Sequence, residues 1–463
     1  MKAKSKWMAI LLVLGLIIAA CGDGGGEDDT TTTAAPAVDT TEAPTETTEA
    51  PTETTEGEMA EIATDVGVDL DAGTISVGLL SDLTGPFSPL VQVIVAGHDV
   101  YWENVNAAGG INGLEVVLNT VDTAYEVPNH VQRYEELKDE VVALGHSTGS
   151  PHTVAINNDL QADGILAIPL TWYSGWTDPE INSNLLHHGI NYCVEAHNVI
   201  GYISETMDDI STIAVVTWPG DYGLDGAIGA VQAAEAAGLE IVYDGSGTVI
   251  PGDESTLTEA ANAVVGSGAD MVYVVTNPTD FASIFGQAIA GGYEGLWTGA
   301  GPSWNPALLG SPIAEAVAAS TIWSGYYGSW SSDAPGVADA KEQVEAAGVL
   351  ERPNSAILEG FVEAMIMHAA LEAAYQAGDM TQAGVLAAAK SLENVDLNGL
   401  GPNETYVGDA NTQLQRVSAS IFQPDLEGFT SGENGGETLL VENYTSGLTA
   451  DYDFTGACFV LEN

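Results

Sequence analysis

The sequence has few basic residues. Its 463 residues include 9 Lys and Arg against 66 Asp and Glu, which gives a formal net charge of −57. Nucleic-acid binding needs Lys and Arg against the phosphates, so this charge excludes a protein that works on DNA or RNA. It also disfavours a protein that lies on an anionic membrane surface. Apolar residues make up 45% of the chain, so most of it is expected to fold.

Cysteine is scarce too, with 3 residues. Three cysteines cannot make a disulfide-scaffold protein, and no Cys-x-x-Cys pair indicates a zinc site. No G-x-x-x-x-G-K-[ST] segment is present, which argues against nucleotide hydrolysis by this chain. His187, His188 and His197 are close in sequence, but their spacing does not match a helical ligand pair with a third ligand. We therefore expect neither a metal site nor a cofactor.

The longest apolar run near the N-terminus is short. Residues 8–20 are apolar and follow Lys2, Lys4 and Lys6, but 13 residues are too few to span a bilayer as a mature helix. The run ends in Ile-Ala-Ala followed by Cys21, which resembles a bacterial lipobox. This pattern predicts a signal peptide over residues 1–20 and a lipid on Cys21 that anchors the protein to the extracytoplasmic side of the bacterial cell membrane. A plain secretory signal with a chance cysteine is the alternative.

Residues 22–73 differ in composition from the rest. They contain no Lys or Arg, are rich in Thr, Glu, Pro and Ala, and repeat Thr-Glu-Ala-Pro-Thr-Glu-Thr at 41–47 and 48–54. Such a segment cannot bury enough apolar surface to fold, and its charges repel one another. We expect residues 21–73 to be a disordered tether between the lipid and the globular part.

The globular part, from residue 74 onward, alternates strands and helices. Residues 74–80 are typical of a buried strand and 92–106 of a helix, and a second series begins with a strand at 211–217. A long apolar helix is expected over 356–377. Strands that are almost continuously apolar indicate parallel sheets covered on both faces. The sequence thus predicts an α/β protein with two doubly wound lobes.

Three segments carry a family resemblance: ISVGLLSDLTGPFS at 75–88, NAAGGINGLEVVL at 106–118 and VVTWPGDYG at 215–223. Together they resemble the substrate-binding component of branched-chain-amino-acid-type ABC importers, which has a type I periplasmic-binding-protein fold. The resemblance extends over about residues 74–425. It implies two lobes joined by a three-crossing hinge, a monomer that closes on a small ligand without catalysis, and docking onto permease and ATPase subunits.

The resemblance also implies how the lobes divide the chain. The first lobe is expected over residues 74–190 and 327–405. The second is expected over residues 191–326 and 406–463. In open parallel sheets, ligands bind beyond the carboxyl ends of the strands, so the site should lie where the two sheets face each other.

The scarcity of arginine limits the ligand. Arg133, Arg352 and Arg416 are the only arginines, and none is in a loop that follows a strand. Helix N-termini can hold a carboxylate without Arg, but an acidic protein repels multiply charged anions. We therefore expect a zwitterionic, neutral or weakly cationic solute, amino-acid-like or aromatic and apolar, and neither a dicarboxylate nor a phosphate ester.

Candidate ligand-binding residues come from two sources. The loops after strands are rich in aromatic residues, which suit a ligand with an apolar body and a polar end, although each could instead pack at the lobe interface. The other candidates follow from the resemblance, position by position. The complete predicted set is Phe87, Ser88, Ser150, Thr153, Thr171, Trp172, Tyr173, Ser174, Tyr222, Thr276, Asn277, Trp304 and Tyr327.

Two other functions remain open. Residues 145–149 read Gly-His-Ser-Thr-Gly, the nucleophile-elbow pattern of α/β-hydrolases. A hydrolase also needs an acid and a mobile His later in the chain, and His368 lies inside an apolar helical segment. The second alternative is a ligand-sensing subunit of a signalling system, which would share the fold.

Cys193 and Cys458 are the two cysteines that remain after lipidation. Cysteines of an exported protein tend to pair. Cys193 lies near the first expected crossing between the lobes and Cys458 near the C-terminus. The sequence therefore predicts a disulfide that ties the C-terminal segment close to the hinge.

Overall fold

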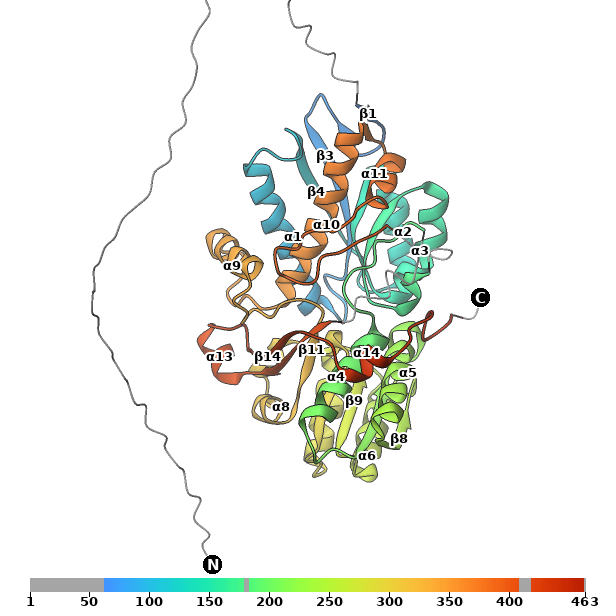
Figure 1. Cartoon of the computed structure of the whole chain (residues 1–463), viewed down its shortest axis with the longest axis vertical. Helices are drawn as coiled ribbons and strands as arrows, with labels where there is room; N and C mark the ends of the chain where they lie inside the picture. The colour runs from blue at the N-terminus through green and yellow to red at the C-terminus, as the bar shows by residue number, and fades with distance from the viewer. Residues whose placement is uncertain (1–61, 179–182, 408–417, 462–463) are drawn as a thin grey trace, which may run out of the picture. The chain divides into compact units, whose positions relative to one another are not determined.

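Two parallel β-sheets, each packed against helices, form the two lobes of the chain in this computed structural model (Figure 1). The structure describes residues 62–178, 183–407 and 418–461. The predicted signal peptide, Cys21 and the Thr-Glu-Pro repeats lie outside the described residues. Within the described part, no helix is both long enough and apolar enough to cross a membrane.

The first lobe is built on a sheet whose parallel strands run in the order β4-β3-β5-β6. Its strands β5 and β6 are fully buried; β6 is apolar, as the hydrophobic runs predict, whereas β5 ends in the polar residues His146, Ser147 and Thr148. The elements of this lobe up to the first crossing are β3 (Thr74–Ser81), α1 (Ser88–Ala107), β4 (Glu115–Asp122), α2 (Val127–Leu137), β5 (Ala143–Thr148), α3 (Ser150–Asp163), β6 (Leu166–Leu170) and η1 (Ser174–Thr177).

The second lobe is built on a sheet with the order β10-β9-β7-β8, in which all pairs are parallel. The two series of alternating strands and helices are therefore confirmed. The elements of this lobe are α4 (Tyr192–Thr206), β7 (Thr212–Thr217), α5 (Gly220–Ala237), β8 (Glu240–Gly245), α6 (Glu254–Ser267), β9 (Met271–Val275), α7 (Pro278–Ala290), β10 (Leu296–Gly299), η2 (Gly301–Ser303), η3 (Pro306–Gly310) and α8 (Ala314–Ser320).

The chain then returns to the first lobe and crosses once more. In Figure 1, α10 lies beside α1 in the upper lobe, and these two helices are in extensive contact. An antiparallel sheet, β11-β13-β14, was not predicted, because the sequence between its strands is long and its edge strand is not regularly apolar. The remaining elements are β11 (Trp323–Gly325), α9 (Pro335–Ala347), α10 (Ala356–Ala377), β12 (Asp379–Met380), α11 (Gln382–Ala389), β13 (Ala419–Pro424), α13 (Leu426–Ser431), β14 (Glu437–Tyr444) and α14 (Gly447–Asp451).

The prediction of a disordered tether up to residue 73 is wrong for the last part of that segment, which contains two short strands. The segment Ala63–Thr64 (β1) pairs with β12, and Val68–Asp69 (β2) pairs with β3. Gly67 between them has a φ of 80°, and a Cβ there would lie 2.2 Å from the backbone nitrogen of Val142. The acidic composition of the segment does not indicate these strands, because backbone pairing and the close contact at Gly67 hold them in place without a large apolar surface.

The helices α1 and α10 cross at two glycines. A Cβ on Gly97 would lie 2.3 Å from the carbonyl oxygen of Ile357, and a Cβ on Gly360 would lie 2.0 Å from that of Ile94. The absence of both side chains lets the backbones touch. This close approach places His98 of α1 within hydrogen-bond distance of Glu363 of α10, with 2.9 Å between Nε2 and Oε2.

We predict that Gly360→Ala lowers the free energy of unfolding by about 2–3 kcal/mol, because the added methyl group forces the two helices apart. Urea unfolding followed by circular dichroism measures the change. Gly266→Ala is the matched control. Nothing lies within 4 Å of a Cβ at this position of α6, so the free energy of unfolding should stay the same or rise by about 0.5–1 kcal/mol. Equal effects at the two sites would contradict the close packing.

Cys193 of α4 and Cys458 form a disulfide across a sequence separation of 265 residues. The segment around Cys458 is also held by hydrogen bonds to both lobes. The Cys458 amide donates to Ser174 Oγ over 2.8 Å, and the Phe459 amide donates to Asp225 Oδ1 over 3.2 Å. Tyr173 donates its hydroxyl to the Phe459 carbonyl oxygen over 2.7 Å. The C-terminal segment therefore spans the boundary between the lobes.

We predict that the double variant Cys193→Ser, Cys458→Ser loses about 3–5 kcal/mol of unfolding free energy, because the disulfide restricts a long loop of the unfolded chain. Reductant should lower the stability of the wild-type protein to that of the variant and leave the variant unchanged. Titration of two free thiols in denatured, unreduced wild-type protein would refute the bond.

Candidate functional site

The loops at the carboxyl ends of the two sheets face each other around a pocket of about 390 Å³, part of which is open to solvent. This first pocket is lined from both lobes. From the first lobe, Phe87, Tyr125, Ser150 and Trp172 follow successive strands of the sheet; from the second come Tyr192, Tyr222 and Pro302.

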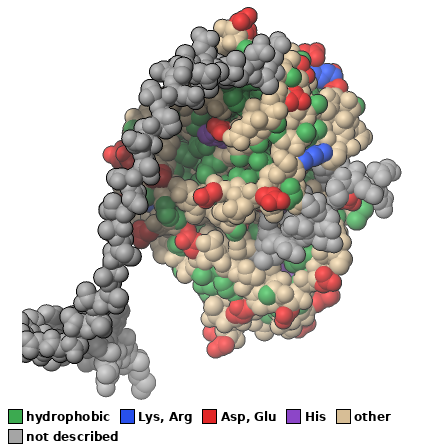
Figure 2. Space-filling view, turned by 45° about the horizontal axis from the view of Figure 1, so that its top comes forward, with side chains coloured by type: hydrophobic (Ala, Val, Ile, Leu, Met, Phe, Trp, Pro, Cys, Tyr) green, Lys and Arg blue, Asp and Glu red, His purple; other side chains and the backbone are tan. Residues whose placement is uncertain are grey.

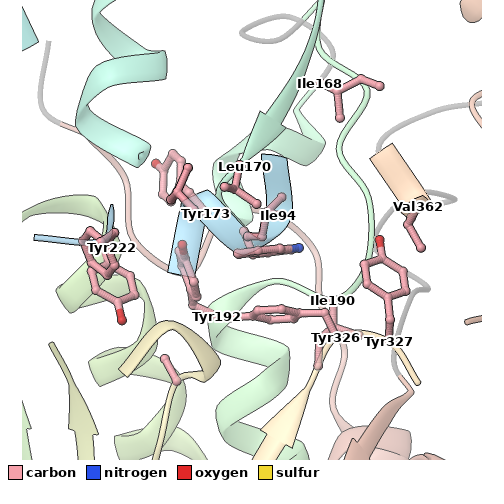
Figure 3. Close-up of a cluster of buried hydrophobic side chains, with 14 of the residues drawn as sticks. Ile94, Ile168, Leu170, Tyr173, Ile190, Tyr192, Tyr222, Tyr326, Tyr327 and Val362 are labelled. Carbon is pink, nitrogen blue, oxygen red and sulfur yellow. The ribbon is translucent and has the colours of Figure 1, made fainter. Parts of the chain in front are cut away.

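Five of the twelve residues that line the first pocket are aromatic. The rings of Tyr192 and Tyr222 are 4.8 Å apart between centroids, and those of Trp172 and Tyr326 are stacked at 3.9 Å with an interplanar angle of 13°. Figure 3 shows Tyr192, Tyr222 and Tyr326 reaching into the same region from different parts of the chain. Because Trp172 follows β6 and Tyr326 follows β11, the stacked pair joins two of the segments that run between the lobes.

The polar groups of the first pocket are neutral. Ser150, the first residue of α3, hydrogen-bonds through Oγ to Thr171 Oγ1. Tyr222 donates its hydroxyl to the Thr276 carbonyl oxygen over 2.8 Å. Gly149, just before α3, has a φ of 96° and turns the chain so that the helix begins at the pocket. Hydroxyls and a helix N-terminus can hold a carboxylate or a carbonyl group without a cation.

A second pocket of about 580 Å³ adjoins the first and shares Leu90, Trp172 and Pro302 with it. Its aromatic lining includes Trp304, Tyr326 and Tyr327. Unlike the first, it also contains carboxylates, Glu359 and Glu437. Of the described residues, no Lys or Arg lines either pocket.

The two carboxylates differ in their partners. Glu437 accepts hydrogen bonds from Trp304 Nε1 over 3.2 Å, from Ser329 Oγ over 3.0 Å and from Ser355 Oγ. Glu359 has a buried Oε2 with no hydrogen-bond partner among the described residues. Burial raises the pKa of both groups, and for Glu359 the pKa lies well above its ordinary value. A cationic group of a ligand beside Glu359 would favour the ionised carboxylate and pair with it.

A third carboxylate, Glu195 at the start of α4, holds the aromatic wall in place. It is fully buried and accepts hydrogen bonds from the Gly301 amide over 2.8 Å and from Ser324 Oγ over 2.7 Å at Oε1. Its Oε2 accepts from the Tyr326 hydroxyl over 2.9 Å. Burial without a cationic partner raises the pKa of Glu195 to about 8.

We predict that Glu195→Gln makes the protein less sensitive to rising pH. A raised carboxyl pKa contributes stability that is complete below about pH 4.5 and is lost as pH rises through about 8. Gln can accept the same two bonds at Oε1 and donate its NH₂ to the Tyr326 hydroxyl, so it keeps the contacts without a charge. At pH 9 the variant should exceed the wild type by on the order of 4 kcal/mol in unfolding free energy.

Urea unfolding at pH 5 and pH 9 measures this difference. Glu259→Gln, at an exposed position of α6, is the control and should unfold as the wild type does at both pH values. A Glu195→Gln variant that loses stability to the same extent as the wild type between pH 5 and pH 9 would contradict the assignment.

The structure brings several of the predicted site residues together. Phe87, Ser150, Trp172 and Tyr222 line the first pocket, and Trp172 also lines the second. Trp304 and Tyr327 line the second pocket as well. Thr171 lies directly behind Ser150, bonded to its hydroxyl.

Other predicted residues lie behind the pocket walls. Thr153 bonds to Ser147 Oγ over 2.9 Å, and Ser174 bonds to Asp225 through both its amide and its hydroxyl. Asn277 caps the N-terminus of α7, where its side-chain oxygen accepts a hydrogen bond from the Asp280 amide. The remaining members that line neither pocket are Ser88, at the start of α1, Tyr173, which bonds to the C-terminal segment, and Thr276, whose carbonyl oxygen receives Tyr222.

The prediction missed Tyr125, Tyr192, Tyr326, Pro302 and Glu359. Tyr125 could have been found, because it follows β4 as Trp172 follows β6. Tyr192 and Glu359 lie on helices that begin after long connections. Neither residue directly follows a strand, so the sequence does not indicate that it is near the site.

The Gly-His-Ser-Thr-Gly segment forms the end of β5 and the turn into α3. Ser147 Oγ lies 3.2 Å from Nε2 of His130, a pair that the sequence did not suggest because His130 precedes the serine. Both side chains are fully buried, and Nδ1 of His130 has no hydrogen-bond partner among the described residues. Burial lowers the pKa of His130 to about 3. The pair therefore lacks both the orienting acid and the access to substrate that a hydrolase needs.

A family model described as periplasmic binding protein matches residues 74–421, well over half of the chain. The chain belongs to the periplasmic binding protein family. This match and the fold confirm the resemblance inferred from the three segments, including the type I arrangement of two parallel-sheet lobes.

Among relatives, the Leu/Ile/Val-binding protein homolog 3 of Brucella melitensis biotype 1 is 29% identical over 209 residues, which cover 43% of this chain and 53% of that protein. The chain thus spans about half the length of the curated relatives it matches. The fatty acid ABC transporter substrate-binding protein from Thermomonospora curvata is 25% identical, with a TM-score of 0.75 over 84% of this chain and 97% of that chain.

A branched chain amino acid ABC transporter structure from Thermus thermophilus with bound valine is similar in fold. It is 20% identical and has a TM-score of 0.68 over 81% of this chain and 98% of that chain. At this identity the likeness shows the fold alone.

Proposed function

We propose that this protein is the extracytoplasmic receptor of an ABC importer and binds a small solute between its two lobes. The observation that carries the proposal is a pocket whose walls come from the strand ends of both sheets, together with membership of the periplasmic binding protein family. We further propose that a lipid on Cys21 holds it to the membrane and that permease and ATPase subunits receive its ligand.

The lining of the pockets supports a ligand with an apolar body. Aromatic rings surround the first pocket, and its polar groups are hydroxyls and a helix N-terminus. Relatives carry names that refer to Leu/Ile/Val and to fatty acids, both of which combine an apolar chain with one carboxylate. We propose a solute of this kind, in which Ser150 and the start of α3 receive the carboxylate or another polar end.

The second pocket supports a zwitterion over a simple anion. Glu359 presents a carboxyl group with an unsatisfied oxygen, and Tyr326 and Trp304 offer ring faces to a cation. An ammonium group would compensate the charge of Glu359 when that group ionises. Two negative charges on the ligand would find no cation in either pocket, so dicarboxylates and phosphate esters should not bind.

Binding should favour the closed arrangement of the lobes, because a ligand that touches both stabilises only the form in which both are near. Trp172 and Trp304 lie at the pockets, so closure should change tryptophan fluorescence. We expect a saturable fluorescence change and a rise in melting temperature with one class of a panel made of aliphatic and aromatic amino acids, their amides, short fatty acids and benzoate.

We predict that Trp172→Ala weakens binding of the selected ligand at least tenfold, because this ring forms a wall of both pockets. Ser150→Ala should weaken binding of the carboxylate form by about tenfold and hardly change binding of its uncharged amide. Isothermal titration calorimetry measures both.

The control is Thr153→Ser, which changes a residue on the same helix that bonds to Ser147 and lines neither pocket. It should leave the dissociation constant unchanged. If no compound of the panel binds, or if the ligand binds Trp172→Ala as tightly as the wild type, the proposed site is wrong.

A further inference from the structure

The core of the first lobe contains a buried cluster of three histidines and one glutamate: His98 of α1, His146 of β5, His188 between β6 and α4, and Glu363 of α10. Glu363 Oε2 lies 2.9 Å from His98 Nε2 and 2.9 Å from His146 Nδ1, and Oε1 lies 3.4 Å from His188 Nε2. We propose that this cluster binds a divalent transition-metal ion of the zinc type.

The distances agree with a compact ligand set. The ligand atoms of His98, His146 and Glu363 all lie within 4.8 Å of one another. An ion with bonds of about 2.0–2.1 Å to N and O, in tetrahedral geometry, separates its ligands by roughly 3.3 Å. The contact between Glu363 Oε1 and His188 Nε2 already has this separation, and neither atom has a hydrogen-bond partner among the described residues. His188 is not a member of this three-residue group, and its contact with Glu363 makes it the fourth ligand that we propose.

In two of the imidazoles, the nitrogen that does not contact Glu363 is hydrogen-bonded to a hydroxyl group. His146 Nε2 lies 2.6 Å from Thr148 Oγ1, and His188 Nδ1 lies 2.5 Å from the Tyr327 hydroxyl. Hydrogen bonds of this kind orient the rings of metal-binding histidines, so that the other nitrogen points at the ion. Thr148 lines the first pocket and Tyr327 the second, so the cluster lies directly beneath both.

The chemistry of the donors selects the ion. Three imidazole nitrogens and one carboxylate suit Zn²⁺, Co²⁺ or Ni²⁺ better than Mg²⁺ or Ca²⁺, which prefer oxygen ligands. Because the ligands come from α1, β5, α10 and the segment before α4, the ion would join both helices of the Gly97–Gly360 crossing to the first connection between the lobes. No motif marks such a site, since each element contributes one ligand.

The test begins with the full purified chain. Metal analysis should find about one equivalent of a transition metal per chain. After removal of the metal with chelator, Co²⁺ should produce the visible absorption bands of a four-coordinate N/O site, and one equivalent of Zn²⁺ should abolish these bands and raise the melting temperature. Tyr327→Phe, which removes the hydroxyl next to His188, should weaken Zn²⁺ binding by about 10–100-fold.

His146→Gln should abolish the Co²⁺ bands, whereas the control His197→Gln, which changes a buried histidine of α4 outside the cluster, should preserve them. Weak binding to the acidic surface would persist in His146→Gln and disappear at high salt. A chain that contains no metal, gives no Co²⁺ bands and melts at the same temperature with or without Zn²⁺ would overturn the proposal and leave a hydrogen-bonded cluster. Solute binding is measured separately, so this result would not count against the receptor function.

Discussion

The buried carboxylates at the lobe junction, Glu195 and Asp225, are held by neutral hydroxyl and amide donors, and the arrangement of the junction depends on this constraint. With 9 basic residues against 66 acidic ones, there are too few cations to pair with interior acids. The Lys and Arg ion pairs of the described residues, such as Arg133–Glu136 and Lys138–Asp163, are partly exposed. Figure 2 shows the consequence at the surface, where red acidic side chains are scattered over the face and blue basic ones are few.

The interior acids connect segments that are distant in sequence. Glu195 joins α4 to η2, to Ser324 of β11 and to Tyr326, which follows that strand. Asp225 joins α5 to Ser174 of the first lobe and to the C-terminal segment. Burial raises the pKa of Asp225 to about 7, so it shares the property of Glu195. Hydroxyls and amides satisfy these groups without filling the pockets with charge, which leaves the aromatic rings to define the shape available to a solute.

The fold could be predicted from the sequence because its strands are apolar and alternate with helices. The site could be predicted only in part. Residues directly after strands, such as Trp172 and Ser150, follow from parallel-sheet topology. Glu359 and Tyr326 do not, since they reach the pockets from a returning helix and from a crossing segment whose position depends on tertiary packing. Likewise, His98 and Glu363 meet only because two glycines let their helices touch.

The disulfide between Cys193 and Cys458 determines how the protein responds to proteolysis. Proteases cut exposed loops, and a single cut anywhere between these two residues leaves both fragments covalently joined. The fragments would also remain docked through Asp225 and Tyr173. After one such cut, the two fragments can separate only when the disulfide is reduced.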